Sequence, residues 1–212
     1  TLYNYKKDSI RNQFQDITLR AGIRNTTMGE FGIKYDPNVQ VNNFTNKNKL
    51  GESSIIVTAP IEKQFGEAFS LKVEGKADIT TYSTKDLTSN VKINNNIFQV
   101  APSLGFSSPR FSINGGIIPT WDNGTFVWLP NVYAEGQVKE KTFLIQAGWV
   151  GRYVKNTFRN LSAINPYLQT IAAQKNTKEI EYYGGIKATA GKHFNFSAKA
   201  GFLSYTNFAL FI

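Results

Sequence analysis

The stretch from residue 69 to residue 81 alternates strictly between apolar or small residues and polar ones. Its odd positions are Phe69, Leu71, Val73, Gly75, Ala77 and Ile79, and its even positions are Ser70, Lys72, Glu74, Lys76, Asp78 and Thr80. A β-strand points successive side chains to opposite faces, so one face is apolar and the other carries charge. Strands in globular domains usually stop after ~5–6 residues. A longer alternation is typical of strands that cross a bilayer, with lipid on one side and water on the other.

Similar alternations recur along the chain, and none of them fits the helical period. The predicted segments are residues 14–25, 29–37, 50–62, 68–82, 92–106, 109–121, 125–138, 141–155, 178–190 and 193–210. We therefore predict an all-β fold, an antiparallel transmembrane β-barrel with about ten strands in this segment. Residues 1–212 are expected to form a single barrel segment without a separate soluble domain.

Composition agrees with a barrel and argues against other membrane and metal-binding classes. Hydrophobic residues make up 41% of the chain, and the mean hydropathy is −0.30. No stretch approaches the ~18 consecutive apolar residues of a membrane helix. In a barrel strand, lumen residues dilute the apolar residues one to one. The absence of Cys excludes disulfides and thiolate metal sites.

The net charge of +9 raises the question of nucleic-acid binding. The basic residues are spread over turns, loops and polar strand faces, with no run longer than Lys6-Lys7. We therefore predict no nucleic-acid partner. The expected partners are outer-membrane lipid, lipopolysaccharide and other outer-membrane proteins, since a positive surface suits anionic head groups.

The predicted connections alternate between tight and longer. The tight set is Asn25–Gly29, Glu62–Glu67, Phe106–Arg110, Val138–Lys141 and Gly191–His193, and the mostly longer set is Asp36–Leu50, Tyr82–Val91, Trp121–Thr125 and Asn156–Lys178. Bacterial barrels have short periplasmic turns and longer extracellular loops. Asn165-Pro166 predicts the start of a short helix within the last loop.

Aromatic residues recur at two heights along the predicted strands. The predicted girdle residues are Phe69, Phe111, Trp121, Phe126, Trp128, Phe143, Tyr153, Tyr182 and Phe194. Phe111 and Trp121 share a face, and so do Phe143 and Tyr153. Each pair is separated by ten residues, which in a tilted strand rise about 25 Å, the height of the apolar band. A large soluble β-sandwich is the alternative fold.

Charged residues on the opposite face are the predicted lumen-lining set. They are Lys72, Glu74, Lys76, Asp78, Glu135, Arg152, Glu181, Lys187 and Lys199. One hypothesis is a solute pathway or a docking surface for a plug or partner. The other is a cross-strand network that fills a closed lumen. Both require mixed charge on the inner wall, so the sequence leaves them open.

The direction of the predicted strands puts both ends of the chain outside the cell. Complete single-chain barrels have an even strand number and normally leave both ends in the periplasm. We therefore expect a segment of a larger barrel, with a self-closed barrel of about ten strands as the alternative.

Two groups of residues carry a family resemblance. They are Gly184-Gly185-Ile186-Lys187 leading to the run from Phe194 to Gly201, and Thr157-Phe158-Arg159-Asn160-Leu161 with Asn165-Pro166-Tyr167-Leu168. With these motifs, most of residues 14–205 resembles outer-membrane β-barrel proteins of Bacteroidota, including TonB-dependent-receptor-like barrels. The resemblance implies the outer membrane of a Gram-negative cell and names no substrate, since this segment shows no plug domain or TonB box.

Transport through the barrel, in the manner of a porin or a TonB-dependent receptor, is the predicted function. A structural or accessory barrel subunit of an outer-membrane complex is the alternative, and a barrel enzyme comes third. We predict no catalytic residues, no metal site and no cofactor. The only histidine, His193, lies beside Lys192 in a predicted turn without an orienting partner for general-base catalysis.

Overall fold

A computed structural model describes residues 13–27, 31–47, 50–85, 90–138, 143–165, 175–190 and 194–209. They form one antiparallel sheet of eleven strands and a short helix. The elements are β1 (Phe14–Gly22), β2 (Ile33–Tyr35), β3 (Asn38–Asn46), β4 (Leu50–Phe65), β5 (Phe69–Lys85), β6 (Asn90–Ser107), β7 (Phe111–Asp122), β8 (Thr125–Val138), β9 (Phe143–Val154), α2 (Phe158–Ile164), β10 (Thr177–Ala190) and β11 (Phe194–Thr206). The predicted all-β fold is confirmed.

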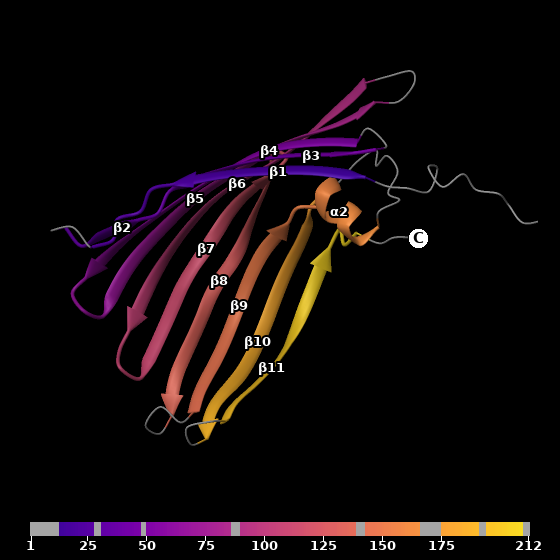
Figure 1. The fold of residues 1–212 in the computed structure, drawn as a ribbon. Coiled ribbons are helices and arrows are strands. Elements are labelled where there is room, and N and C mark those ends of the chain that lie inside the picture. Colours follow the sequence, from indigo (N-terminus) through magenta and orange to yellow (C-terminus); the bar gives the residue numbers. More distant parts are fainter. Residues whose placement is uncertain are drawn as a thin grey trace, which may run out of the picture.

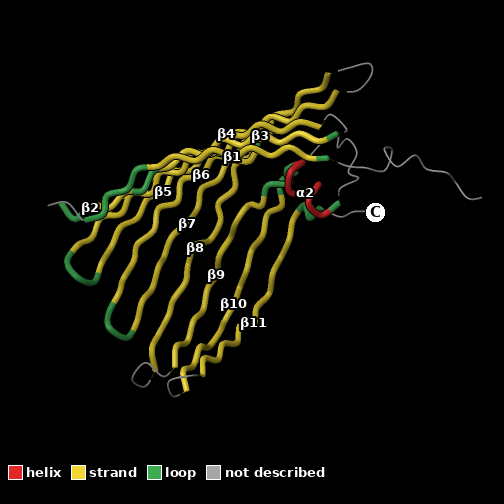
Figure 2. Tube along the Cα trace, in the orientation of Figure 1, coloured by secondary structure: helices red, strands yellow, loops and turns green. Residues whose placement is uncertain are grey.

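The strands follow one another in the sheet almost in chain order, from β1 and β3 through to β11, with β2 paired to β4. Figure 1 shows that the sheet is curved, with α2 at one end of its strands. Figure 2 shows the same arrangement, with helix confined to that end. Within the described residues β1 and β11 do not pair with each other, so these strands alone do not close a barrel.

β2 and β3 continue one another along the edge of β4. Ile33 pairs with Lys63 and Asn38 with Thr58, which is a single unbroken register. Pro37 lies between the two strands and lacks an amide donor. The predicted strand 29–37 contains β2, but the predicted loop Asp36–Leu50 was wrong, because strand structure extends through residues 38–46.

The sequence of β3 resembles that of a loop because it is rich in asparagine. Asparagine disfavours strands in general, but here the Asn42 side chain forms hydrogen bonds with both neighbouring strands. The Asn42 amide donates to Ser54 Oγ at 2.8 Å, and the Thr18 hydroxyl donates to Asn42 Oδ1 at 3.0 Å. Cross-strand hydrogen bonds thus stabilise a strand that propensity does not favour.

The connections are grouped as predicted at two ends of the sheet, but most of those predicted to be longer are short. We call the end with the β3–β4, β5–β6, β7–β8 and β9–β10 connections the helix end and the opposite end the far end. β5 and β6 reach 17 and 18 residues, so they extend into the predicted loop. Asn123 and Gly124 form a two-residue hairpin turn with φ of 50° and 85°. The long connection at the helix end is β9–β10, which contains α2.

The sheet has an outer face that is largely apolar and an inner face that carries α2. Outward side chains from separate strands remain exposed, such as Ile61 at 53%, Trp128 at 58% and Ile145 at 51%. A soluble monomer rarely exposes so extended an apolar surface. No helix among the described residues is long and apolar enough to cross a membrane.

Candidate functional site: an inward-folded segment over a charged inner face

Strand pairing determines which residues share the inner face. The paired positions Lys72–Ser103, Glu135–Gln146 and Lys187–Leu144 carry this face from strand to strand. All nine predicted lumen residues lie on it: Lys72, Glu74, Lys76, Asp78, Glu135, Arg152, Glu181, Lys187 and Lys199. Whether this face lines a lumen stays a prediction.

The nine predicted girdle residues lie together on the outer face. Phe69, Phe111, Phe143 and Phe194 are the first residues of their strands at the far end, Trp121, Phe126, Trp128 and Tyr153 lie toward the helix end, and Tyr182 lies within β10. Rings contact one another at both ends, with centroids 5.1 Å apart for Phe69 and Phe106 and 5.3 Å apart for Trp121 and Phe126. Contact with membrane interfaces stays a prediction.

The described parts of the β9–β10 connection, residues 155–165 and 175–176, lie over the helix end of the inner face, and we call them the inward-folded segment. Its helix α2 begins after Thr157, whose side chain accepts a hydrogen bond from the Asn160 amide, and ends at Asn165. Asn165, predicted to start a helix, is thus the C-cap of α2, and the residues that would follow it lie outside the described part of the chain. The sequence does contain a signal for the start of α2. Thr157 lies three residues before Asn160, which is the spacing between an N-cap hydroxyl and the amide that donates to it.

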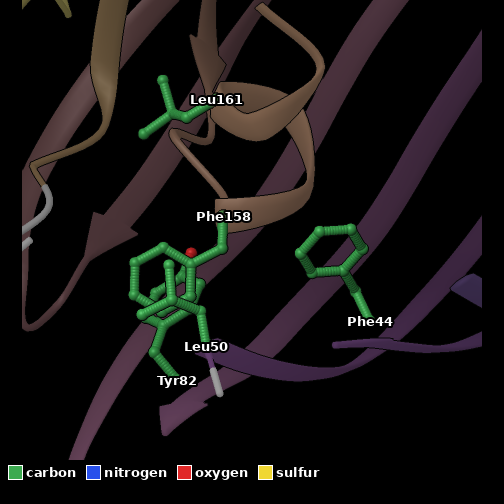
Figure 3. Close-up of a cluster of buried hydrophobic side chains, with 5 residues drawn as sticks. All are labelled: Phe44, Leu50, Tyr82, Phe158 and Leu161. Atoms are coloured by element: carbon green, nitrogen blue, oxygen red, sulfur yellow. The ribbon is translucent and has the colours of Figure 1, made fainter. Parts of the chain in front are cut away.

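An apolar cluster fixes α2 against the sheet. Phe158 and Leu161 pack with Phe44, Leu50 and Tyr82 of β3, β4 and β5, as Figure 3 shows. The Phe158 and Tyr82 rings have centroids 4.9 Å apart. All five side chains are at most 5% exposed. These contacts join the β9–β10 connection to strands more than 70 residues earlier in the chain, which requires the sheet to curve around α2.

A buried ion pair lies immediately before this helix. Lys155 Nζ lies 2.5 Å from Asp78 Oδ1 and donates to Thr80 Oγ1 at 2.8 Å. The two charged side chains are only 7% and 11% exposed. Burial lowers the pKa of the Lys155 ammonium, and the bond to Asp78 opposes that shift. Asp78 therefore compensates a charge that would otherwise be buried alone.

Acidic side chains of β4 and β1 hold the first turn of α2. The buried Glu52 carboxylate accepts a hydrogen bond from the Arg159 amide at 3.1 Å. The Arg159 side chain forms an ion pair with Asp16 at 2.7 Å. Backbone N–H groups at the start of a helix lack partners within it, and negative charge there is favourable. Glu52 thus fixes the position of the helix as well as its start.

Asparagines hold the other side of the connection. Asn176 is fully buried, exchanges amide hydrogen bonds with Asn95 at 2.7 and 2.9 Å, and donates to Asp122 at 2.6 Å. Asn123 also donates to Asn95, at 3.0 Å. These bonds connect the start of β10 to β6 and the β7–β8 turn. Both ends of the inward-folded segment are therefore anchored to the sheet.

Elsewhere on the inner face the charges form more exposed pairs. Lys72 pairs with Glu74 at 3.3 Å and Lys199 with Glu181 at 2.5 Å, and Arg152 pairs with Glu179. Within the described residues, Lys76, Glu135 and Lys187 form no ion pair. This part of the inner face keeps charge available to solvent.

Sequence reasoning missed Lys155, Glu52, Glu179 and Asn176. Glu179 shares a face with Glu181 two residues later, so the alternation alone could have included it. Lys155 and Asn176 flank a loop, where alternation gives no information about direction. His193, which the sequence analysis placed in a turn, lies outside the described residues. No group of His, Cys, Asp or Glu among the described residues could hold a metal ion.

Comparisons with known proteins identify the fold. No protein-family model matches the chain. No curated protein matches it either. The siderophore receptor PirA from Pseudomonas aeruginosa matches with a TM-score of 0.65 at 12% identity, over 92% of this chain and 39% of the receptor. A mutant of the ferric enterobactin receptor PfeA from the same species matches with a TM-score of 0.67 at 12% identity, over 92% of this chain and 35% of that one.

The chain thus spans less than two fifths of each receptor that it matches. At 12% identity the likeness concerns the fold alone. The predicted fold class, an antiparallel sheet of the transmembrane β-barrel type, is confirmed.

Proposed function

We propose that this chain forms a segment of an outer-membrane β-barrel of the TonB-dependent-receptor type, which carries solutes along its inner face and is not an enzyme. The observation that carries the proposal is the separation of faces in a receptor-like fold. Nine charged residues of five strands share the inner face, while the outer face exposes apolar and aromatic side chains. Lipid on one side and water on the other is the environment that suits both.

The proposal includes a location and partners. The protein would lie in the outer membrane of a Gram-negative cell, within the Bacteroidota. Its outer face would contact lipid and lipopolysaccharide, with the aromatic residues at both ends near the head groups. All residues of the chain would belong to one barrel segment.

The inward-folded segment would act as a constriction at the helix end. It occupies the inner face where β1, β3, β4, β5 and β6 are nearest to α2, and it is held by the Glu52, Lys155 and Asn176 contacts. Solutes that enter from the helix end would pass this constriction and then meet the charges around Lys72, Lys76 and Lys187. The excess of cations in the predicted lumen set favours anions weakly.

A second function is favoured by the ion pairs. Six of the nine predicted lumen residues are paired, some with buried partners, which suits a filled wall in a structural or accessory subunit. This alternative predicts no permeation, even when the constriction is loosened.

Planar-bilayer conductance of the full-length protein tests the two functions. Transport predicts conductance that favours anions weakly and loses this preference when Lys72, Lys76 and Arg152 are neutralised together. Asn176→Ala should raise the conductance, because the constriction loses hydrogen bonds to Asn95 and Asp122. Absence of conductance in all variants, including one without any plug, would favour the accessory-subunit function.

A further inference from the structure

The backbone ladder between β8 and β9 ends partway along the two strands. Pairing runs from Val138–Phe143 to Asn131–Val150 and stops there. Residues 125–129 of β8 pair only with β7, and residues 152–154 of β9 only with β10. These two stretches face each other without pairing, and we call them the β8/β9 seam. It lies in the wall toward the helix end.

The sequence explains why the ladder stops at this point. Pro130 has no amide to donate to β9. Opposite it, Gly151 has no room for a side chain, since a Cβ there would lie 2.8 Å from Leu129 Cβ and 2.9 Å from Pro130 Cδ. β9 then leaves the line of β8 and leads to Lys155, which is held on the inner face by Asp78. The seam is closed by side-chain contact rather than by hydrogen bonds.

The seam lies between an apolar outer surface and a small cavity on the inner face. On the outer side it is bordered by Trp128. Leu129, which is fully buried, closes it from the inner side. Beyond lies a cavity of about 180 Å³ lined by Val150, Gly151, Arg152, Glu179, Glu181 and Leu203. Gly151 and Arg152, which lie in β9 where its ladder to β8 has ended, bring this cavity next to the seam.

We propose that the β8/β9 seam is a lateral portal for amphiphiles with one alkyl chain and an anionic head group. The proposal rests on the proposed membrane location. The alkyl chain would enter between β8 and β9 against Leu129, and the head group would meet Arg152. The Arg152 Nε donates to Glu179, while its side chain is 61% exposed. Arginine has further donors that can bind a carboxylate or phosphate oxygen.

Cysteine labelling tests the portal, because the chain has no native cysteine. Leu129→Cys in the full-length protein, reconstituted in liposomes, is treated with a long-chain alkyl maleimide dissolved in the bilayer. Thr80→Cys is the matched control, since Thr80 is only 1% exposed on the inner face of β5, whose ladders to β4 and β6 are both continuous. We expect labelling of Leu129→Cys at least tenfold faster than that of Thr80→Cys. Equal rates, or faster labelling of Leu129→Cys by a charged water-soluble maleimide, would overturn the proposal.

Competition tests the ligand class. A long-chain fatty acid should slow alkyl-maleimide labelling of Leu129→Cys more than the fatty alcohol of equal length, because only the acid presents an anion to Arg152. Equal protection by both would overturn the assignment of an anionic head group.

Amide hydrogen exchange of the unmodified protein keeps the proposal testable if Leu129→Cys does not fold. Peptides covering residues 126–129 and 152–154 should contain amides that exchange much faster than those of residues 132–138. Pro130→Ala restores a donor and should slow that exchange. Uniform protection along β8 and β9 would contradict the seam. These measurements do not depend on conductance, so the portal and the transport function can fail separately.

Discussion

The two ends of the inner face carry the same kinds of residues in different states. At the helix end, Glu52 is 4% exposed and accepts a hydrogen bond from Arg159 of the inward-folded segment. Asn176 of that segment is fully buried and donates to Asp122 of the sheet. Toward the far end, the Lys72 and Glu74 side chains are 45% and 33% exposed and form an ion pair with each other. Burial, rather than residue type, separates the two regions.

This difference assigns the two hypotheses for the lumen charges to different places. A buried charge is tolerated only with a partner and further hydrogen bonds, which is the situation of Asp78 with Lys155 and Thr80. An exposed pair contributes little to stability and keeps its interaction with water. The helix end therefore suits a structural network, and the far end suits contact with solutes.

Removal of one member of the buried pair should give the largest effect on stability. Asp78→Ala leaves the Lys155 ammonium buried without compensation, so we expect a loss of about 3–5 kcal/mol in the free energy of unfolding. Denaturant titration of the protein in liposomes measures it. A double variant, Asp78→Ala with Lys155→Met, should recover much of the loss. A loss of less than ~1 kcal/mol for Asp78→Ala would mean that both ends of the inner face behave as exposed surface.

Alternation predicted the faces and the strands more reliably than the connections. Register is determined by which side chains must avoid water or lipid, and that information lies in consecutive residues. The extent of β3 depends on Asn42, whose hydrogen bonds come from β1 and β4, so no local pattern contains it. The direction of the β9–β10 connection likewise depends on contacts with distant strands, so no local pattern predicts it.

A charge on the outer face should be the next most costly change. Ile145→Arg introduces a cation on the apolar side of β9, and we expect a loss of ~2–4 kcal/mol for a position near the middle of the membrane. Gln146→Arg is the matched control, because the adjacent residue points to the inner face. Unfolding in liposomes of defined thickness gives both values. Equal tolerance of arginine at the two positions would contradict the membrane location of the outer face.

The helix anchor should have an intermediate effect. Glu52→Gln keeps the size of the side chain but removes the negative charge at the start of α2, and we expect a loss of about 1 kcal/mol. Amide hydrogen exchange should rise within residues 158–164, while the strands stay protected. Glu62→Gln, on the same face of β4 and toward the far end, is the control and should leave that exchange unchanged. Equal exchange in both variants would mean that Glu52 does not hold the helix.

The sequence revealed only part of the candidate site, because several of its contacts join residues that are far apart in the chain. Asp78 was identified from its place in an alternating strand, but its partner Lys155 lies 77 residues away in the chain. Phe158 and Leu161 precede a predicted helix rather than belonging to it, because their packing against Tyr82 exists only after the segment folds inward. Local patterns give the faces of strands, whereas the site depends on contacts that the curved sheet creates.

Removal of the exposed pair should have the smallest effect on stability and a measurable effect on permeation. For Lys72→Ala with Glu74→Ala we expect about 0–1 kcal/mol in the free energy of unfolding, because both side chains are partly solvated.

The permeation effect separates local charge from net charge. Lys72→Ala alone should weaken the anion preference of any conductance, and Glu74→Ala alone should strengthen it. Both differences should vanish in high salt, since the Debye length falls to about 3 Å at 1 M. If neither variant changes the anion preference while Asp78→Ala does, solutes contact the helix end instead, and the assignment of the two ends must be reversed.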